Sequence, residues 1–167
     1  MYDRTPEGAR ARAEIAARFD VEQRKVTEIQ GIEAGYQYVD SPIVWPESGV
    51  RPDPDARAYT PTTWPGARLP HVWLDDGTAL HDRIGDGFTL LCLGGTQADT
   101  EGLAQALRAI GAPLDVLEIA DETARAVYGY DLLLLRPDLH VAWRGNTPPD
   151  DAKRLASIVA GRTARSE

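Results

Sequence analysis

The stretch 132–144 constrains the fold of this chain more than any other part of the sequence. Four consecutive leucines lead to Arg136, the pair Pro137-Asp138 follows, and a second, largely apolar run covers 139–143. Proline presets the backbone for the first corner of a tight turn, and aspartate tolerates the second corner. The stretch therefore predicts a β-hairpin, two antiparallel strands joined by a short turn.

The chain before and after this hairpin alternates between apolar strands and amphipathic helices. The helix after the first strand is the most clearly marked, because Asp99 or Thr100 can cap it and Gly111 and Pro113 end it. Its apolar positions follow the helical period, at Leu103, Ala106, Leu107 and Ile110. The expected elements are strands over 88–93, 114–119, 131–135 and 139–143, and helices over 100–110 and 121–127 and after a cap at Thr147.

This order of elements predicts a fold class. A crossover helix makes the first two strands parallel, and the Pro-Asp turn makes the last two antiparallel. We therefore expect an α/β protein with a thioredoxin-like, mixed four-stranded sheet and flanking helices over residues 67–163.

The first forty residues are expected to be mainly helical. Thr5 is a good N-cap and Pro6 suits the first helical position. A helix through Phe19 is expected, with a second helical piece over 21–30 that ends at Gly31 and a short strand over 36–39. The apolar face of the first helix is thin, so it should pack on a larger body. That face consists of Ala9, Ala13, Ala16 and Ala17.

A proline-rich segment over 41–66 follows. Trp45, Tyr59 and Trp64 lie within it, and bulky aromatic side chains argue against free disorder. We expect it to wrap over another part of the molecule, to self-associate or to stay loosely ordered, and we expect proteases to cut it first and leave a fragment that begins near Arg68. A strand over 72–74 and an Asp-Gly turn come next.

Composition excludes several classes of function. The net charge of −8 and the pI near 4.9 argue against nucleic-acid binding, which needs clustered Lys and Arg. No apolar run approaches the length of about 20 residues that spans a bilayer, and the first residues do not resemble a signal peptide. A single cysteine, Cys92, cannot form an internal disulfide and fits a reducing, cytoplasmic location.

No redox or nucleotide-binding motif is complete. Thioredoxin enzymes carry a Cys-x-x-Cys pair after the first strand, whereas the loop 94–99 here holds no cysteine. Cys92 falls inside the apolar strand and is expected to be a buried, unreactive core residue. Gly85-Asp86-Gly87 precedes a strand, and Gly94-Gly95 favours a tight turn over an anion site.

The remaining polar candidates do not define a catalytic site. The three histidines lack metal-ligand spacing, and neighbours such as His81-Asp82 point in different directions. Arg136, Asp138 and Arg144 flank the hairpin and could form an ion-pair cluster, for which a structural use outweighs anion binding. We therefore predict no catalytic, cofactor-binding or metal-binding residue.

Several motifs, in order, resemble the C-terminal region of FAD-dependent aromatic-ring hydroxylases of the phenol and dichlorophenol monooxygenase, hydroxyphenylpropionate hydroxylase and polyketide hydroxylase type. The resemblance rests on the strings Pro65-Gly66-Ala67-Arg68-Leu69-Pro70-His71-Val72-Trp73-Leu74, Asp76-Gly77, Leu80-His81-Asp82, Gly87-Phe88-Thr89-Leu90-Leu91, Leu135-Arg136-Pro137-Asp138 and Val141-Ala142-Trp143-Arg144. Gly35-Tyr36, Tyr38 and Ser41-Pro42 match the family's linking segment. One departure is Leu139, because the family usually has glycine after Arg-Pro-Asp.

The resemblance implies a role outside the chemistry of such enzymes. Their FAD, reduced by NAD(P)H, hydroxylates a phenolic ring, but the flavin motifs of the family are missing here. The chain is thus expected to be a non-redox accessory portion serving packing, active-site covering or subunit contact, and to bind no flavin by itself. Its partners would be the flavin-binding domain or another copy; the alternative is a stand-alone thioredoxin-like protein-binding module. Structural or interface candidates are Arg68, His71, Trp73, Arg136, Asp138, Trp143 and Arg144.

Overall fold

The computed structural model describes residues 5–27, 29–95 and 99–162. The chain divides into two compact units. The first comprises Met1–Gly35 and Pro54–Thr60, and the second comprises Tyr36–Asp53 and Pro61–Glu167.

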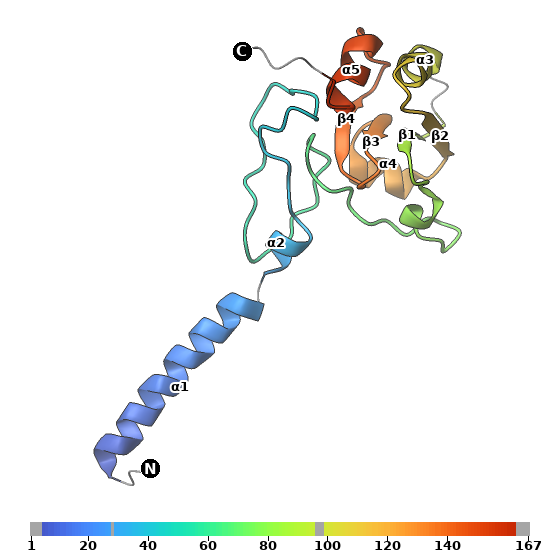
Figure 1. Ribbon diagram of the computed structural model, residues 1–167. Helices are drawn as coiled ribbons and strands as arrows, with labels where there is room; N and C mark the ends of the chain where they lie inside the picture. The colour runs from blue at the N-terminus through green and yellow to red at the C-terminus, as the bar shows by residue number, and fades with distance from the viewer. Residues whose placement is uncertain (1–4, 28, 96–98, 163–167) are drawn as a thin grey trace, which may run out of the picture. The chain divides into compact units, whose positions relative to one another are not determined.

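The second unit contains a four-stranded sheet in the order β2-β1-β3-β4 (Figure 1). The strands are β1 (Phe88–Leu93), β2 (Leu114–Ile119), β3 (Leu132–Leu135) and β4 (Val141–Gly145). β1 pairs parallel with β2 and antiparallel with β3, and β3 pairs antiparallel with β4. The predicted fold class, a thioredoxin-like mixed sheet with flanking helices, is confirmed.

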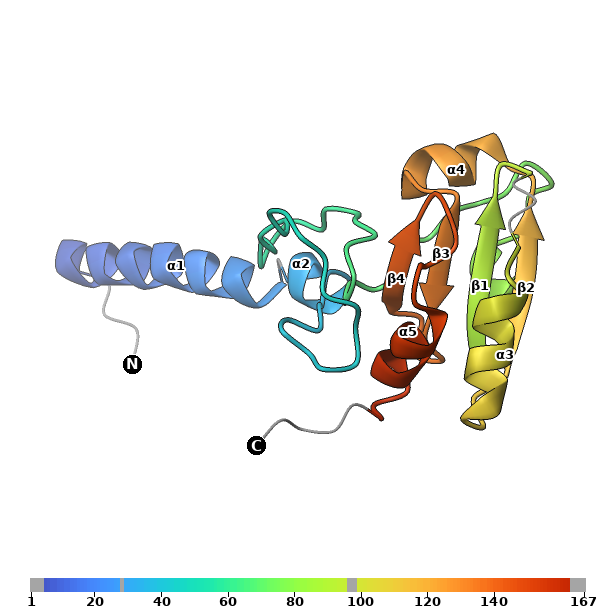
Figure 2. The same cartoon turned by 90° about the horizontal axis from the view of Figure 1, so that it is seen from above.

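Helices cover both faces of this sheet, which explains why its central strands are apolar on both sides. Helices α3 (Glu101–Ala109) and α5 (Ala152–Val159) pack on one face, and α4 (Glu122–Tyr128) lies on the other (Figure 2). The side chains of β3 alternate between the two resulting cores. Leu132 and Leu134 belong to the core under α3 and α5, whereas Leu133 and Leu135 belong to the core under α4.

Cys92 lies in β1 and is 4% exposed, so the prediction of a buried thiol is confirmed. Burial raises the pKa of this thiol, and the negative charge of Glu118 on β2 adds to the effect. The thiolate is therefore disfavoured. Residues 96–98 of the loop that follows β1 lie outside the described residues.

The proline-rich segment covers the outer edge of β4. The amide of Gly66 donates to the Val141 carbonyl (2.7 Å), and the Val141 amide donates to Ala67 (2.9 Å). Further along, the Trp45 amide donates to the Ala142 carbonyl (2.8 Å). An exposed sheet edge invites pairing with other chains, and this segment pairs the Val141 amide and the carbonyls of Val141 and Ala142.

The hairpin between β3 and β4 differs in detail from the expectation. β4 begins at Val141 and not at 139, because the loop spans three residues and Leu139 takes a left-handed backbone (φ 62°). The Leu139 amide donates to the Arg136 carbonyl (2.9 Å), and the Arg136 amide donates to His140 (2.9 Å). This pattern is typical of three-residue hairpin loops, whose last loop residue has a positive φ and is usually glycine.

The first unit contains α1 (Pro6–Thr27) and α2 (Gln30–Glu33). The predicted division into helices ending at Phe19 and beginning at Val21 is wrong, since neither residue breaks a helix and α1 continues through both. Gly31 is needed in α2, because a Cβ atom there would meet the Asp55 carbonyl oxygen at 1.6 Å. Residue 28, within the predicted second helix, lies outside the described residues.

Three other local predictions are corrected. The segments 36–39 and 72–74 form only isolated bridges, Gln37 to Ala67 and Trp73 to Ala79, because each segment runs directly into a turn. A 3-10 helix, η1 (Leu80–Arg83), follows the second bridge. The cap of α5 is Asp151, whose carboxylate accepts from the Arg154 amide at 2.9 Å, and not Thr147.

Candidate functional site

An exposed aromatic surface lies on the loop that precedes β1. We call it the His-Trp surface and define it by His71, Trp73 and His81. Trp73 is 64% exposed, and its ring meets the His71 ring edge to face with centroids 4.9 Å apart. The His71 ring stacks on that of His81, and their Nδ1 atoms are 3.4 Å apart. A large exposed aromatic side chain of this kind is typical of interfaces.

The backbone holds this surface in place. Val72 and Leu74, on either side of Trp73, are buried in the core under α4, so the exposed ring alternates with two anchored side chains. The Leu74 amide donates to the Thr78 carbonyl (2.9 Å), and the Leu80 amide donates to Val72 (3.1 Å). These contacts fix the backbone on both sides of Trp73, so its side chain is held at the surface.

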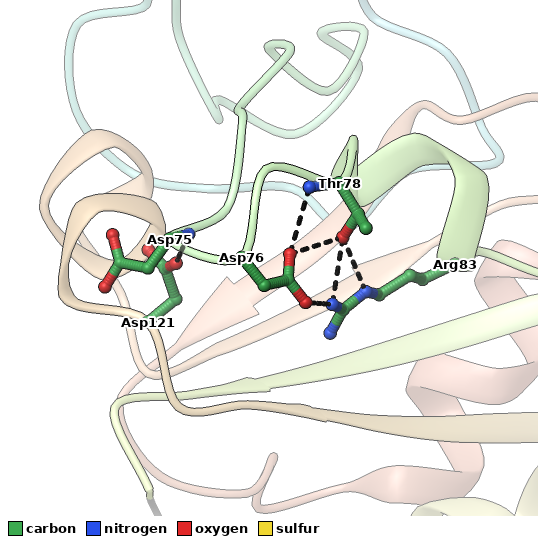
Figure 3. Close-up of polar contacts among 5 residues, drawn as sticks. All are labelled: Asp75, Asp76, Thr78, Arg83 and Asp121. Atoms are coloured by element: carbon green, nitrogen blue, oxygen red, sulfur yellow. Dashed lines mark hydrogen bonds and ion pairs between the residues drawn. The ribbon is translucent and has the colours of Figure 1, made fainter.

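Polar contacts close the tip of the same loop (Figure 3). The Asp76 carboxylate accepts from the Thr78 amide (3.0 Å) and hydroxyl (2.7 Å), and it forms an ion pair with Arg83. These hydrogen bonds from Thr78 are the main reason that the pKa of Asp76 lies below its ordinary value. The Asp-Gly turn predicted at this point is thus reinforced by side chains.

Asp121 ties the loop to α4. Its carboxylate accepts from the Ala124 amide (2.8 Å), which caps α4. It also accepts from the Asp75 amide at 2.7 Å, as Figure 3 shows. These two N–H donors lower the pKa of Asp121. One side chain thus serves as helix cap and loop anchor.

Burial lowers the pKa of His81, and the neighbouring His71 lowers it further. Arg68 acts in the same direction as His71. The neutral form of His81 is therefore favoured near pH 7. The His-Trp surface thus offers aromatic faces flanked by the cationic Arg68, which is itself exposed.

Arg144 joins the proline-rich segment to the sheet. Its guanidinium forms two hydrogen bonds with the Glu47 carboxylate (2.6 and 3.0 Å) and one with the Thr63 hydroxyl (3.0 Å). It also lies over the rings of Trp64 (5.1 Å) and Tyr130 (4.5 Å). The Arg144 side chain is only 10% exposed, which indicates a structural clamp.

Arg136 and Asp138 form a second structural cluster with different partners. Arg136 Nη1 donates to the Val159 carbonyl near the end of α5 (2.6 Å), and its Nε lies 3.5 Å from the Asp138 carboxylate. Asp138 also accepts a hydrogen bond from the Tyr38 hydroxyl (3.0 Å), and the Tyr38 ring stacks on the His140 ring. Although burial opposes it, the hydrogen bond from Tyr38 and the charge of Arg136 lower the pKa of Asp138.

The structure separates the residues that the sequence singled out. Arg68, His71 and Trp73 lie at the exposed loop, Arg136 and Asp138 at the hairpin, and Trp143 in the core under α3 and α5, 7% exposed. Arg144 pairs with Glu47, so the three-membered cluster considered for Arg136, Asp138 and Arg144 does not form as such. The sequence analysis missed several partners: Tyr38, Glu47, Thr63 and Asp121. An aspartate at the start of a predicted helix is a local signal for the cap at Asp121, whereas no local pattern marks the contacts of the other three.

Within 5–27, 29–95 and 99–162, no group of three or more His, Cys, Asp or Glu side chains could hold a metal ion. In the same part of the chain, no helix combines the length and the apolar character needed to cross a bilayer.

Comparison with known proteins gives a consistent result. The family model described as "Aromatic-ring hydroxylase, C-terminal" matches residues 62–162. Over 78% of the present chain, the sequence is 39% identical to FAD-dependent monooxygenase apdD of Emericella nidulans. Over 95% of the present chain, it is 32% identical to phenol 2-monooxygenase of a Pseudomonas species. It covers 22% and 29% of those proteins, respectively.

The solved structure of the rebeccamycin biosynthetic enzyme RebC with reduced flavin is also similar. It superimposes with a TM-score of 0.77 at 33% identity, over 96% of this chain and 30% of RebC. The chain therefore spans less than a third of the length of the relatives that it matches.

Proposed function

Because this chain belongs to the family of aromatic-ring hydroxylase C-terminal regions, we propose that it acts as the accessory, non-redox portion of an FAD-dependent aromatic hydroxylase. In such an enzyme it would pack against the flavin-binding portion, cover the active site or contact another subunit. The observation that carries this proposal is Trp73, an exposed aromatic side chain on an anchored loop, within the region that matches the family.

The residues of this chain do not fit a flavin. The turn at Gly94 and Gly95 follows β1 directly, but the sequence lacks the spaced glycines of a dinucleotide loop, and Gly85-Asp86-Gly87 precedes a strand. The flavin and its NAD(P)H reductant would thus be held by the other portion of the enzyme. What the second unit offers is an exposed aromatic side chain, that of Trp73, on a loop whose neighbouring side chains are buried.

A chimera tests the proposal. Phenol 2-monooxygenase of the Pseudomonas species is truncated at the region that this chain matches, and the chain is then fused in its place. We expect the truncated enzyme to form less hydroxylated phenol per NAD(P)H consumed, since an uncovered site loses its intermediates to water. The chimera should regain part of this coupling.

Two variants of the chimera separate surface contact from mere folding. Trp73→Ser removes the exposed ring of the His-Trp surface and should abolish the regained coupling. Val50→Ser, at a residue that is 93% exposed elsewhere in the second unit, should leave the coupling unchanged. Equal coupling in the truncated enzyme and the chimera would contradict the accessory role.

A further inference from the structure

The structure brings together two histidines, His71 and His81, whose spacing along the chain is not that of a metal site. They are ten residues apart in the sequence. The bridge between Trp73 and Ala79 pairs the two segments antiparallel. Two residues further out on each side, this register places His71 opposite His81, so the two side chains meet across the turn.

The two imidazole rings turn the same edge toward a common gap. Their Nδ1 atoms are 3.4 Å apart, whereas their centroids are 5.4 Å apart. Each ring therefore directs its Nδ1 atom toward the other ring. Two nitrogen ligands of a tetrahedral Zn²⁺ ion, each about 2.0–2.1 Å from the metal, lie about 3.3–3.4 Å from each other. The separation of the two Nδ1 atoms thus matches that of a zinc chelate.

The surrounding backbone holds the pair in this orientation. Val72, which follows His71, and Leu80, which precedes His81, are both buried in the core under α4. The backbone of Leu69 also hydrogen-bonds to the His81 ring. A backbone contact of this kind commonly fixes the ring of a metal-binding histidine. His71 is exposed and His81 is half-buried, so an ion can reach both from the solvent.

The pair of ligands selects a class of ion. Imidazole nitrogen suits Zn²⁺ and Cu²⁺, whereas Mg²⁺ and Ca²⁺ prefer the oxygens of carboxylates and carbonyls. In the part of the chain that the structure describes, no third His, Cys, Asp or Glu side chain completes a group that could hold the ion. Water would fill the remaining positions of the metal, so binding should be weaker than in a four-ligand structural site.

We propose that His71 and His81 form a two-histidine chelate for Zn²⁺ at the His-Trp surface, through their Nδ1 atoms. The ion would cross-link the segments on either side of the bridge between Trp73 and Ala79 and hold the surface more firmly. This inference goes beyond the accessory role. It is tested on the 167-residue chain alone, so its outcome and that of the chimera are independent.

Calorimetric titration of the metal-free, untagged chain with Zn²⁺ measures the binding. We expect one ion per chain and a micromolar dissociation constant. His71→Gln and His81→Gln should each weaken the binding by about tenfold or more, because losing a ligand costs at least as much as losing a group that orients one.

His140→Gln is the matched control for this titration. His140 is the only other histidine of the sequence, and its ring stacks on that of Tyr38. This variant should bind Zn²⁺ as the wild type does, and circular dichroism verifies that each variant is folded.

Quenching of tryptophan fluorescence by Cu²⁺ locates the ion. Cu²⁺ binds nitrogen ligands more tightly than Zn²⁺ does and quenches a tryptophan close to it. The Trp73 ring lies 4.9 Å from the His71 ring between centroids, so one equivalent of Cu²⁺ should quench part of the emission. Trp73→Phe should lose most of this saturable quenching while keeping the affinity for Zn²⁺.

Three results overturn the inference. They are the absence of Zn²⁺ binding up to millimolar concentration, equal binding by the wild type and both variants His71→Gln and His81→Gln, and quenching by Cu²⁺ that Trp73→Phe leaves unchanged. The first of these results would show that the two Nδ1 atoms share only a proton.

Discussion

Leu139 occupies a backbone position that favours glycine. Its φ of 62° brings the Cβ atom close to the following carbonyl oxygen, which costs about 1–2 kcal/mol in L-residues. The sequence analysis already marked Leu139 as a departure from the pattern of the family that the chain resembles. The hairpin forms in spite of this cost, because the leucines of β3 are buried and β3 pairs with β4. The proline-rich segment adds backbone hydrogen bonds to β4.

We predict that Leu139→Gly is more stable than Leu139→Ala by about 1 kcal/mol. Both variants lose the same leucine side chain, which is half-buried, so their difference isolates the backbone strain. Urea unfolding monitored by tryptophan fluorescence measures it. Equal stability of the two variants would show that the left-handed conformation is not maintained in solution.

Arg144 is expected to be the most sensitive charged residue of the second unit. Arg144→Ala should lower the free energy of unfolding by about 3 kcal/mol or more, because it leaves the Glu47 carboxylate largely buried without its cation. Arg125→Ala is the matched control. The pair of Arg125 and Asp131 is about 30% exposed, and its loss should cost about 1 kcal/mol or less, measured by the same urea titration.

At the scale of elements, the attachment of α4 to the loop 75–83 depends on the ionised form of Asp121. Its pKa is lowered in the folded chain by the amides of Ala124 and Asp75. In the unfolded chain the pKa of Asp121 is near 3.8, and in the folded chain it is lower. The ionised carboxylate therefore stabilises the fold fully at pH values above 3.8, and this stabilisation is lost as the pH falls through the pKa of the folded chain.

Asp121→Asn should therefore reduce the melting temperature at pH 6 and flatten the loss of stability below about pH 4. The amide still offers one oxygen to an N–H donor but cannot ionise. Thermal melts between pH 6 and pH 3, monitored by circular dichroism, measure the effect. An acid limb as steep as that of the wild type would indicate that other carboxylates, such as Asp76 and Asp138, dominate it.

The burial of strand β1 can be tested separately through the reactivity of the Cys92 thiol. The thiol is buried and its raised pKa disfavours the reactive thiolate, so a thiol reagent should label the chain only after denaturant is added. The change in absorbance on labelling with an aromatic disulfide measures the rate. Labelling of the native chain as fast as that of a free thiol would contradict the burial of β1.

At the scale of the whole molecule, the proline-rich segment is not uniformly accessible. Residues 52–58 are exposed, whereas Trp45 and Gly66 donate backbone hydrogen bonds to β4. Within this segment, trypsin should cut first after Arg57, because the only other arginine, Arg51, precedes a proline. Exposure of the Arg68 side chain should not suffice for cleavage, because the next amide, that of Leu69, donates to the Leu139 carbonyl (2.8 Å).

We expect the two products of this cut to stay associated, because Tyr36–Asp53 belongs to the same compact unit as the sheet. Limited proteolysis analysed by mass spectrometry and by size-exclusion chromatography measures both properties. The variant Arg57→Gln, which lacks the cleavage site, serves as the control. A first cut at Arg68 instead would show that the segment leaves the sheet edge.

What the sequence determined by itself was the order and pairing of the strands. The Pro-Asp turn, the helix between β1 and β2 and the leucine run of β3 are local patterns, and local patterns depend only on neighbouring residues. For the same reason the burial of Cys92 could be predicted. The predicted division of the first helix after Phe19 was wrong, and the cap of α5 was placed at Thr147 instead of Asp151, because helix ends depend on weak, competing signals.

Only the tertiary structure decided which distant side chains meet. Glu47 and Arg144 are 97 residues apart, Tyr38 and Asp138 are 100 apart, and Thr63 reaches the Tyr128 carbonyl across 65 residues. Such contacts arise when the chain folds back on itself, so no spacing along the sequence marks them. The roles of Arg144 as a clamp and Asp121 as an anchor, and the exposure of Trp73, follow from that folding, because burial and partners are properties of the packed molecule.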